Sequence, residues 1–468
     1  MKYSLLIFFA LLTVGVTGQE QTRLYGQAPD FAGEDIKLYR YTNRITNEEE
    51  QIGVIGMDAD GSFETTLSLK ETSYIFMRIG VYEAFIFLEP GRGYHLLFPE
   101  RQDKTMAEKL NPYFEPVLYH LGVENSSDSE LNYLLAWFNE MYQQMINNNI
   151  QLIYSKSRKL DVDGEIARLD SIFGKYPNPF FQDYIRYKYA AFRHLSYHEK
   201  SKSISNTYYL NQQVLYNNPA YWDLFNQIYD DYLGYFLRTP KGKSLYTIIN
   251  EKKCYSCLRD TLGSEKVMSN DTLKELVLLK SLYNEFYDDQ FSRASMLVIL
   301  DSLRQTTMVD KHKTFASDIY QKVVKLLVGY EPPGFELYDK DSVLISLEDL
   351  KGNYVYLNFC TSISYSCIQE FEMLRKLRER HNDRFKIVTI CMDESLPQMK
   401  NFVEKQGYDW TFLHYGRQSD IMKDYDIRAF PTYYFIGPDG KLLLSPAPSP
   451  SENVEQKIYE ILKRDGVL

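Results

Sequence analysis

A cysteine at the start of an amphipathic helix, Cys367, is the residue of this chain best placed to do chemistry. It follows an apolar, β-rich segment, Tyr354–Phe359, and a short loop. Apolar residues then recur on one helical face, at Phe371, Leu374 and Leu377. The positive end of a helix stabilises a thiolate, which is the reactive form of cysteine. We therefore expect Cys367 to act in thiol–disulfide exchange.

The position three residues before Cys367 holds Ser364, whereas exchange at such a helix commonly uses a Cys-x-x-Cys pair. A serine cannot form a mixed disulfide, so one of the two usual thiols is missing. Cys360, at the end of the strand, offers a replacement. A disulfide forms there only where the two α-carbons come within about 7 Å. The hypothesis is that Cys360 and Cys367 form an unorthodox redox pair.

The other three cysteines are predicted to be structural. Cys391 lies in the apolar run Phe385–Met392, which is typical of a central strand and a buried, inert thiol. Cys254 and Cys257 form a Cys-x-x-Cys motif, for which a local structural disulfide between helices is favoured and a redox relay to Cys367 is the alternative. A zinc site would need two more ligands, and no second Cys-x-x-Cys or His-x-x-x-His follows. The sequence predicts no metal and no cofactor.

The last third of the chain resembles periplasmic thioredoxin-like thiol–disulfide oxidoreductases and the related redoxins. Three segments carry this resemblance, in the family's order: PPGFELYD at Pro332–Asp339, ISLEDLKGNYVYLNF at Ile345–Phe359 and YDIRAFPTYYFIGPDGK at Tyr425–Lys441. The resemblance implies an α/β thioredoxin-like domain whose ancestral activity is thiol–disulfide exchange.

The resemblance also assigns site residues. Pro431 matches a cis-proline that faces the active site, and Ser364 to Cys367 match the Cys-x-x-Cys. Cys360 stands where the family usually has tryptophan, and Glu370 matches an acidic residue common three positions after the second cysteine. In that family the second cysteine resolves the mixed disulfide formed by the first. A non-catalytic role for Cys367 is therefore an open alternative.

Peroxiredoxins share the fold and suggest a lesser alternative. They carry a hydroxyl residue three positions before the peroxide-reducing cysteine, as Ser364 stands before Cys367. They also have a proline where this chain has Cys360 and an arginine where it has Pro431, and Arg428 is out of register. A peroxidase is therefore a weaker expectation than a thiol–disulfide oxidoreductase.

Composition and the first residues indicate a compartment. The net charge of −10 argues against nucleic acid or an anionic membrane as a partner. Residues 1–18 are predicted to be a secretory signal peptide, with Lys2, an apolar core Leu5–Val16 and small residues at the cleavage site. No later segment is predicted to span a membrane. With the resemblance, this favours the oxidising periplasm and envelope proteins as partners.

The chain is predicted to be multidomain, with an N-terminal antiparallel β-sandwich (19–101), a helical middle domain (102–330) and the thioredoxin-like domain (331–468). Asp60-Gly61 predicts a hairpin between two sandwich strands. Ser127 and Glu130 predict a capping box before a helix over Leu131–Ile153, and Asn270 or Thr272 predicts another cap. The many tyrosines of the middle domain are expected to pack their rings inside and keep their hydroxyls wet.

Two functions of different classes remain open on the sequence. The first is an exported oxidoreductase that acts through Cys367, with Cys360 as its partner, on envelope protein thiols. The second is a non-catalytic binding module that keeps the thioredoxin scaffold and its groove beside Pro431 without the dithiol reaction.

Overall fold

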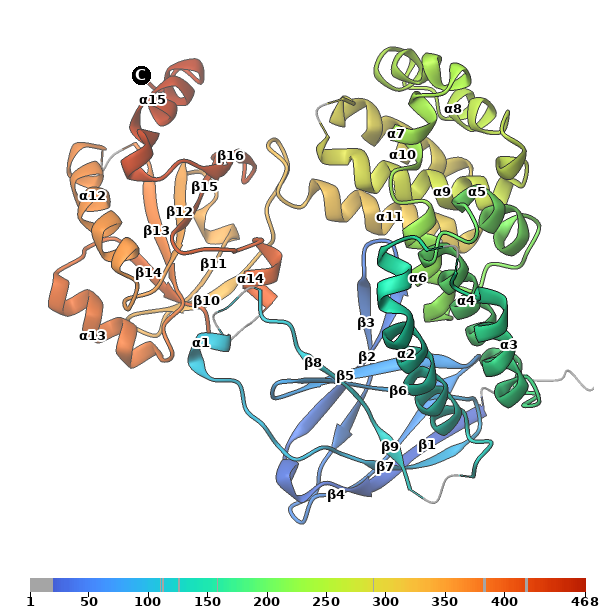
Figure 1. Cartoon of the computed structure of the whole chain (residues 1–468). Helices are drawn as coiled ribbons and strands as arrows, with labels where there is room; N and C mark the ends of the chain where they lie inside the picture. Colours follow the sequence, from blue (N-terminus) through green and yellow to red (C-terminus); the bar gives the residue numbers. More distant parts are fainter. Residues whose placement is uncertain are drawn as a thin grey trace, which may run out of the picture. The chain divides into compact units, whose positions relative to one another are not determined.

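The computed structural model describes residues 20–468 except 110, 112, 125–126, 158, 289, 382–383 and 417–419. The predicted signal peptide lies outside the described residues. Two compact units make up the chain: residues up to Gln102 with Val117–Ile228, and Asp103–Pro116 with Tyr229–Leu468. The predicted multidomain architecture is confirmed: β-sheets at the N-terminus, helices in the middle and an α/β domain at the C-terminus (Figure 1).

Two sheets that share one apolar core form the N-terminal part. The strands of the first sheet are, in spatial order, β4 (Ser62–Leu69), β1 (Glu20–Gln27), β7 (Gly93–Leu97) and β9 (Gly122–Val123). Those of the second sheet are β3 (Glu48–Gly56), β2 (Asp35–Asn43), β5 (Ser73–Ile79), β6 (Tyr82–Leu88) and β8 (Val117–His120). The sequence predicts antiparallel pairing throughout. Two strand pairs differ from this prediction, because β1 pairs with β7 and β6 pairs with β8 in parallel.

The predicted hairpin at Asp60-Gly61 is wrong, although the turn exists. The backbone N–H of Gly61 donates to Asp58 O (2.9 Å), but β4 then pairs with β1 over its whole length. The two strands that flank the turn therefore belong to different sheets. A turn motif fixes the local reversal of the chain, whereas burial of the apolar face decides which sheet the strand joins.

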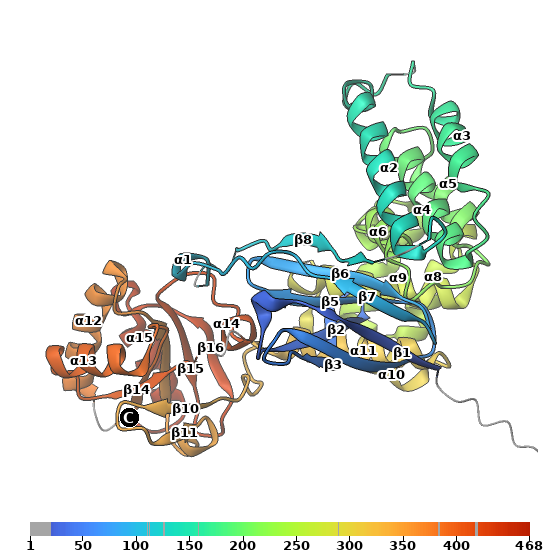
Figure 2. The same ribbon diagram turned by 90° about the horizontal axis from the view of Figure 1, so that it is seen from below.

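Helices of the first unit follow the sheets, and α2, α3 and α4 lie side by side (Figures 1 and 2). Their bounds are α2 (Leu131–Tyr154), α3 (Val162–Phe173), α4 (Pro179–Leu195), α5 (Ser201–Ile204), a π-helical turn (Ser205–Tyr209) and α6 (Pro219–Ile228). The predicted capping box is wrong: Glu130 is itself the N-cap of α2 and accepts the N–H of Tyr133.

The second unit holds α1 (Met106–Lys109) and the remaining helices of the middle region. These are α7 (Tyr232–Leu237), α8 (Tyr255–Leu262), α9 (Asp271–Asn284), α10 (Arg293–Thr306) and α11 (Asp310–Val324), with short 3-10 or π turns at Pro240–Ser244, Thr247–Lys252, Lys266–Met268 and Glu285–Tyr287. Asn270 caps α9 as predicted, since its side chain accepts the N–H of Leu273 (2.9 Å).

A seven-stranded sheet forms the C-terminal domain. Its spatial order is β11 (Leu344–Ser346), β10 (Glu336–Asp339), β14 (Thr411–His414), β13 (Lys386–Cys391), β12 (Val355–Cys360), β15 (Thr432–Ile436) and β16 (Leu442–Ala447). The central strands β12, β13 and β14 are parallel, and every residue of β12 is buried. Such strands must be covered on both faces.

Helices cover both faces of this sheet. Residues of α12 (Tyr365–His381), α13 (Leu396–Gln406) and α15 (Val454–Arg464) pack on one face, and α14 (Asp420–Asp424) contributes to the other (Figure 1). The predicted apolar side of α12 is confirmed, since Phe371, Leu374 and Leu377 are buried. Each such side chain contributes about 1.5–3 kcal/mol of burial free energy, which holds the start of α12 against the end of β12.

Candidate functional site

The site lies where β12 ends and α12 begins. Ser364 precedes the first turn of α12, and its Oγ accepts the N–H of Cys367 (3.4 Å). This is the N-cap role that serine prefers. Cys367 is fully buried beneath that turn. The structure thus places the predicted cysteine at the positive end of the helix, where a thiolate is stabilised.

Cys360 and Cys367 are in contact. A hydrogen bond joins the two thiols, and both are free of disulfide bonds in this structure. Donation from Cys360 lowers the pKa of Cys367, and the backbone N–H of Thr361 and the Ser364 hydroxyl add to this against the effect of burial. Burial raises the pKa of Cys360 well above its usual value, and the bond to Cys367 adds to this. Of the two thiols, Cys367 is therefore the one that ionises more readily.

Cys391 is the third thiol of this region. It lies opposite Cys360 in the parallel β12–β13 pair and is buried. Burial raises its pKa well above the usual value, and the charge of Asp393 adds to this. The raised pKa disfavours the thiolate of Cys391. Its burial in the central strand β13 is what the apolar run Phe385–Met392 predicts.

Pro431 and Glu370 border the same region. The Phe430–Pro431 peptide bond is cis, and Pro431 directly precedes Thr432, which pairs with Phe359. The antiparallel register therefore brings Pro431 to the end of β12 that carries Cys360. Glu370 lies one turn further along α12, where its carboxylate accepts the hydroxyl of Ser451 (2.5 Å). The candidate residues Cys360, Ser364, Cys367, Glu370 and Pro431 thus gather around one helix end.

Asp393 belongs to the site and was missed by the sequence analysis. This buried carboxylate accepts the hydroxyl of Thr361 and the N–H of Ser362, both at 2.8 Å. It therefore fixes the loop between β12 and α12. Its charge also acts on Cys367, whose pKa it raises against the three donors. An aspartate directly after a buried strand, in Cys391-Met392-Asp393, was the available signal.

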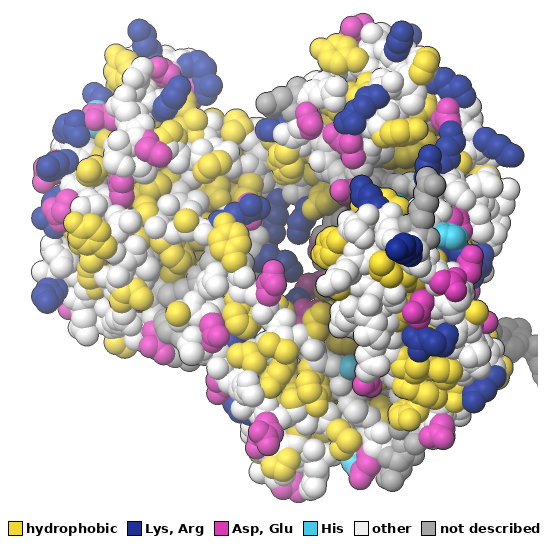
Figure 3. Space-filling model, viewed as in Figure 1, with side chains coloured by type: hydrophobic (Ala, Val, Ile, Leu, Met, Phe, Trp, Pro, Cys, Tyr) yellow, Lys and Arg dark blue, Asp and Glu magenta, His cyan; other side chains and the backbone are white. Residues whose placement is uncertain are grey.

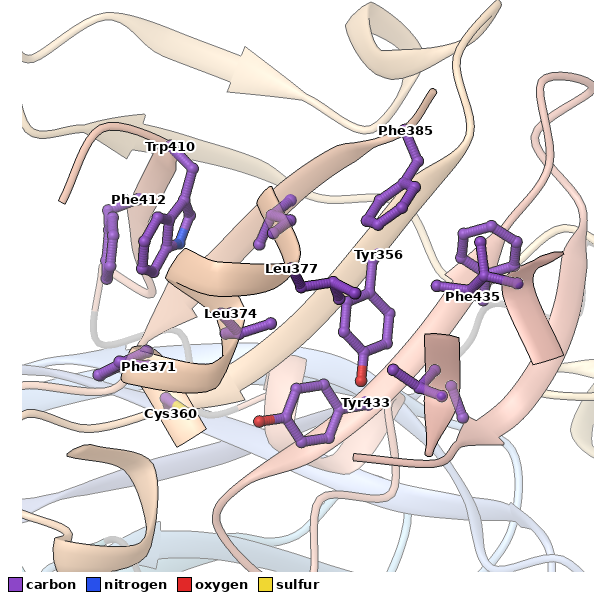
Figure 4. Packing of buried hydrophobic residues seen from close by; sticks show 14 of the residues in the cluster. Tyr356, Cys360, Phe371, Leu374, Leu377, Phe385, Trp410, Phe412, Tyr433 and Phe435 are labelled. Atoms are coloured by element: carbon purple, nitrogen blue, oxygen red, sulfur yellow. The ribbon is translucent and has the colours of Figure 1, made fainter. Parts of the chain in front are cut away.

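Tyr433 is the second residue that was missed. Its ring stacks on Tyr356 with centroids 5.1 Å apart, and Figure 4 shows its hydroxyl directed toward Cys360. That hydroxyl is buried and has no hydrogen-bond partner. Burial raises the pKa of Tyr433 far above its usual value, and the nearby Cys360 adds to this. Tyr433 therefore presents a neutral O–H to the thiol pair.

The other predicted cysteines are outside this site. Cys254 and Cys257 are joined by a disulfide at the start of α8. Among the described residues, no group of three or more His, Cys, Asp or Glu side chains could hold a metal ion. In the same part of the chain, none of the helices has the length and apolar character to cross a membrane.

On the face in Figure 3, Lys and Arg side chains are interspersed with Asp and Glu.

Comparisons with known proteins match the C-terminal part of the chain. The family model described as "AhpC/TSA family" matches residues 328–444. A thiol-disulfide oxidoreductase named ResA from one Bacillus cereus strain is 28% identical to this chain over 153 residues, which cover 32% of this chain and 86% of the relative. The ResA protein of a second Bacillus cereus strain is 31% identical over 121 residues, which cover 25% of this chain and 69% of the relative.

Among solved structures, the thioredoxin domain of a thiol-disulfide oxidoreductase from Bacteroides vulgatus is 20% identical, covers 29% of this chain and 98% of its own, and has a TM-score of 0.27. Through its C-terminal domain, this chain belongs to the AhpC/TSA redoxin family and is related to the ResA thiol-disulfide oxidoreductases.

Proposed function

We propose that the C-terminal domain is a thiol–disulfide oxidoreductase that works through Cys360 and Cys367 in place of the usual Cys-x-x-Cys. One observation carries this proposal: the two thiols are hydrogen-bonded, with the pKa of Cys367 lowered and that of Cys360 raised. A thiolate beside a protonated thiol is the state from which dithiol exchange begins.

The reaction balances in electrons and protons. The Cys367 thiolate attacks one sulfur of a substrate disulfide, and the other sulfur leaves as a thiolate. Cys360 then gives its proton to that departing thiolate, attacks the Cys367 sulfur and releases the second substrate sulfur as a thiolate. Two electrons have passed to the substrate, and a Cys360–Cys367 disulfide remains for a dithiol protein to reduce. Because Cys367 is fully buried, the loop 361–364 has to move for the first attack.

We further propose that the protein is exported to the periplasm and acts on envelope protein thiols. The predicted signal peptide at residues 1–18 supports this, as does the net charge of −10, which disfavours nucleic acid as a partner. An oxidising compartment would supply disulfide substrates.

The test compares wild type with Cys360→Ser, Cys367→Ser and Cys391→Ser in glutathione buffers, by differential alkylation and non-reducing peptide mass spectrometry. Cys391→Ser is the matched control, since Cys391 is equally buried and adjoins Cys360 in the sheet. We expect a reversible Cys360–Cys367 disulfide in wild type and Cys391→Ser and its absence in the other two. If both thiols stay reduced in every buffer, the proposal is wrong.

A non-catalytic binding module is the second candidate. The full burial of Cys367 and the serine at the half-buried N-cap position favour it. Ser364→Cys separates the two candidates in an insulin-reduction assay. If only this variant reduces insulin, the wild-type scaffold has lost the dithiol reaction and serves binding.

A peroxiredoxin-like peroxidase is the lesser candidate. The hydrogen bond from the Ser364 hydroxyl to the Cys367 sulfur favours it. Arg428 argues against it, because its guanidinium is bound to Asp426 (2.9 Å). Consumption of hydrogen peroxide that depends on Cys367 would support this candidate.

A further inference from the structure

The Cys254–Cys257 disulfide lies outside the C-terminal site, and its position is that of a reactive pair. Cys254 is the N-cap of α8, and its sulfur accepts the N–H of Cys257 (3.2 Å). Ser256 Oγ lies 3.4 Å from the same sulfur. When the disulfide is opened, a Cys254 thiolate would therefore find donors and the positive end of a helix already in place.

The pair is also accessible. Both cysteines are half-buried, and the preceding Lys252 and Lys253 are exposed. Positive charge beside a cysteine favours its thiolate. The three cysteines of the C-terminal domain, in contrast, are all buried.

The surrounding backbone is held without help from the disulfide. The N–H of Cys254 donates to Ile248 O (3.2 Å), and that of Leu258 donates to Cys254 O (3.1 Å). The Thr261 hydroxyl donates to Cys257 O (2.7 Å), and the Tyr255 hydroxyl bonds to Glu275 (2.9 Å). Opening the disulfide thus leaves the start of α8 in place.

Asn250 ties the preceding π-helical turn, Thr247–Lys252, to the start of α10. Its side chain accepts the N–H of Ser292 (2.6 Å), and its backbone carbonyl accepts the Ser295 hydroxyl (3.2 Å). A disulfide between residues three positions apart closes a very short loop, so it restricts the unfolded chain less than a disulfide that closes a longer loop would. Stabilisation of the fold is therefore a weak reason for this disulfide.

We propose that Cys254–Cys257 is a second redox site, which exchanges electrons with dithiols or disulfides of other proteins. A thiolate of a dithiol protein attacks one sulfur of the pair, and the other leaves as a thiolate that takes up a proton. The donor's second thiol then closes its own disulfide and frees the attacked sulfur. Two electrons pass from the donor to the pair. In reverse, Cys254 is the nucleophile toward a substrate disulfide.

The experiment uses the full-length protein in a Cys360→Ser/Cys367→Ser background, so that its outcome is independent of the function proposed for the C-terminal domain. Native protein is equilibrated with mixtures of reduced and oxidised glutathione at neutral pH, and the thiols are trapped by alkylation for mass spectrometry. We expect reversible reduction of the pair and an unchanged circular dichroism spectrum. Cys391→Ser, which removes the remaining free cysteine and leaves the pair and its surroundings untouched, is the matched control and should cycle too.

Two single variants test the assigned nucleophile. In Cys257→Ser, we expect oxidised glutathione to form a mixed disulfide on Cys254 about ten-fold faster than it forms one on Cys257 in Cys254→Ser. Equal rates would contradict the role of the helix end. A pair that stays oxidised in every glutathione mixture until the protein unfolds is a structural disulfide and overturns the proposal.

Discussion

At the scale of single residues, the site is defined by donors that converge on one sulfur. Cys367 receives hydrogen bonds from the Cys360 thiol, the Thr361 N–H and the Ser364 hydroxyl, and together they lower its pKa despite burial. Hydrogen bonds to the charged form of a group favour that form. In the function that we propose, two different groups act where the family has its first cysteine: a hydroxyl at the start of the helix and a thiol on the strand.

Removing the Ser364 hydroxyl should raise the pKa of Cys367, because one donor to the thiolate is lost. In Ser364→Ala we expect the thiolate absorbance of Cys367, measured against Cys367→Ser, to titrate at higher pH than in wild type. Loss of the N-cap should also reduce the free energy of unfolding by about 1 kcal/mol. Ser366→Ala is the control, because Ser366 is exposed on the same helix. An equal shift in both variants would contradict the assignment.

Neutralising Asp393 should act in the opposite direction. Its charge raises the pKa of Cys367, so in Asp393→Asn the pKa should fall further and the thiolate should persist to lower pH. The amide oxygen can still accept from Thr361 and Ser362. The same absorbance titration measures the shift, with Glu394→Gln, one residue along and exposed, as the control. A rise in the pKa would show that Asp393 acts only by holding the loop.

At the scale of elements, buried polar groups tie the helices together. The ring of Tyr187 is buried, but its hydroxyl donates to Tyr208 O (2.8 Å), and Tyr209 does the same to Tyr221 O (2.8 Å). The expectation that the tyrosine hydroxyls stay wet is therefore wrong for these two residues. Most buried hydroxyls have a hydrogen-bond partner, and main-chain carbonyls provide it for these two tyrosines.

The buried carboxylate of Glu275 links α9, on which it lies, to α8 and α11. It accepts the Tyr255 hydroxyl (2.9 Å) and the Thr307 hydroxyl (2.7 Å), and its carboxylate lies 3.0 Å from Nδ1 of the buried His312. Burial acts to raise the pKa of Glu275, but the three hydrogen bonds outweigh it and keep this pKa below its usual value. The hydrogen bond with His312 contributes most to this lowering. The carboxylate is thus stabilised by folding.

Glu275→Gln should lower the free energy of unfolding at neutral pH by about 1–3 kcal/mol, because its three hydrogen-bond partners lose a charged acceptor. Since the folded pKa is depressed, this contribution is complete above the unfolded pKa of about 4.3 and is lost as the pH falls through the folded pKa. The difference in thermal unfolding midpoint should therefore shrink on acidification. Asp271→Asn, an exposed carboxylate on the same helix, should have a smaller effect at neutral pH. A difference that is independent of pH would exclude this linkage.

At the scale of the whole molecule, the redoxin domain is joined to the helices through a short bonded segment. The N–H of Gly329 donates to Leu442 O (2.8 Å), and the Ser445 hydroxyl donates to Leu326 O (2.6 Å). The chain after α11 is therefore attached to β16 before it enters the sheet. The domain boundaries themselves stay predictions.

Export is a property of the whole chain and can be tested directly. We expect the mature protein to begin at Gln19 and to be recovered from the periplasmic fraction, with the N-terminal peptide identified by mass spectrometry. Leu11→Arg, which interrupts the apolar core of the signal, should leave an uncleaved protein in the cytoplasm, whereas Leu11→Ile should be processed normally. Cytoplasmic wild-type protein that still carries residues 1–18 would contradict the proposal.

The sequence by itself determined the local features. The strand–helix order around Cys367, the apolar face of α12 and the cap at Asn270 follow from residue type and spacing, which act over a few positions. The family motifs added the α/β domain, since several of them occur in the right order. These signals need no knowledge of distant contacts.

Only the tertiary structure decided which distant groups meet. It joins β4 to β1 rather than to β3, brings Asp393 and Tyr433 to the thiols, and sets the Cys360 thiol against Cys367. Each outcome depends on how strands from separate parts of the chain pack to bury their apolar faces. Local sequence does not encode that choice, and this is why the sequence offers Cys360 as a second thiol only as a hypothesis.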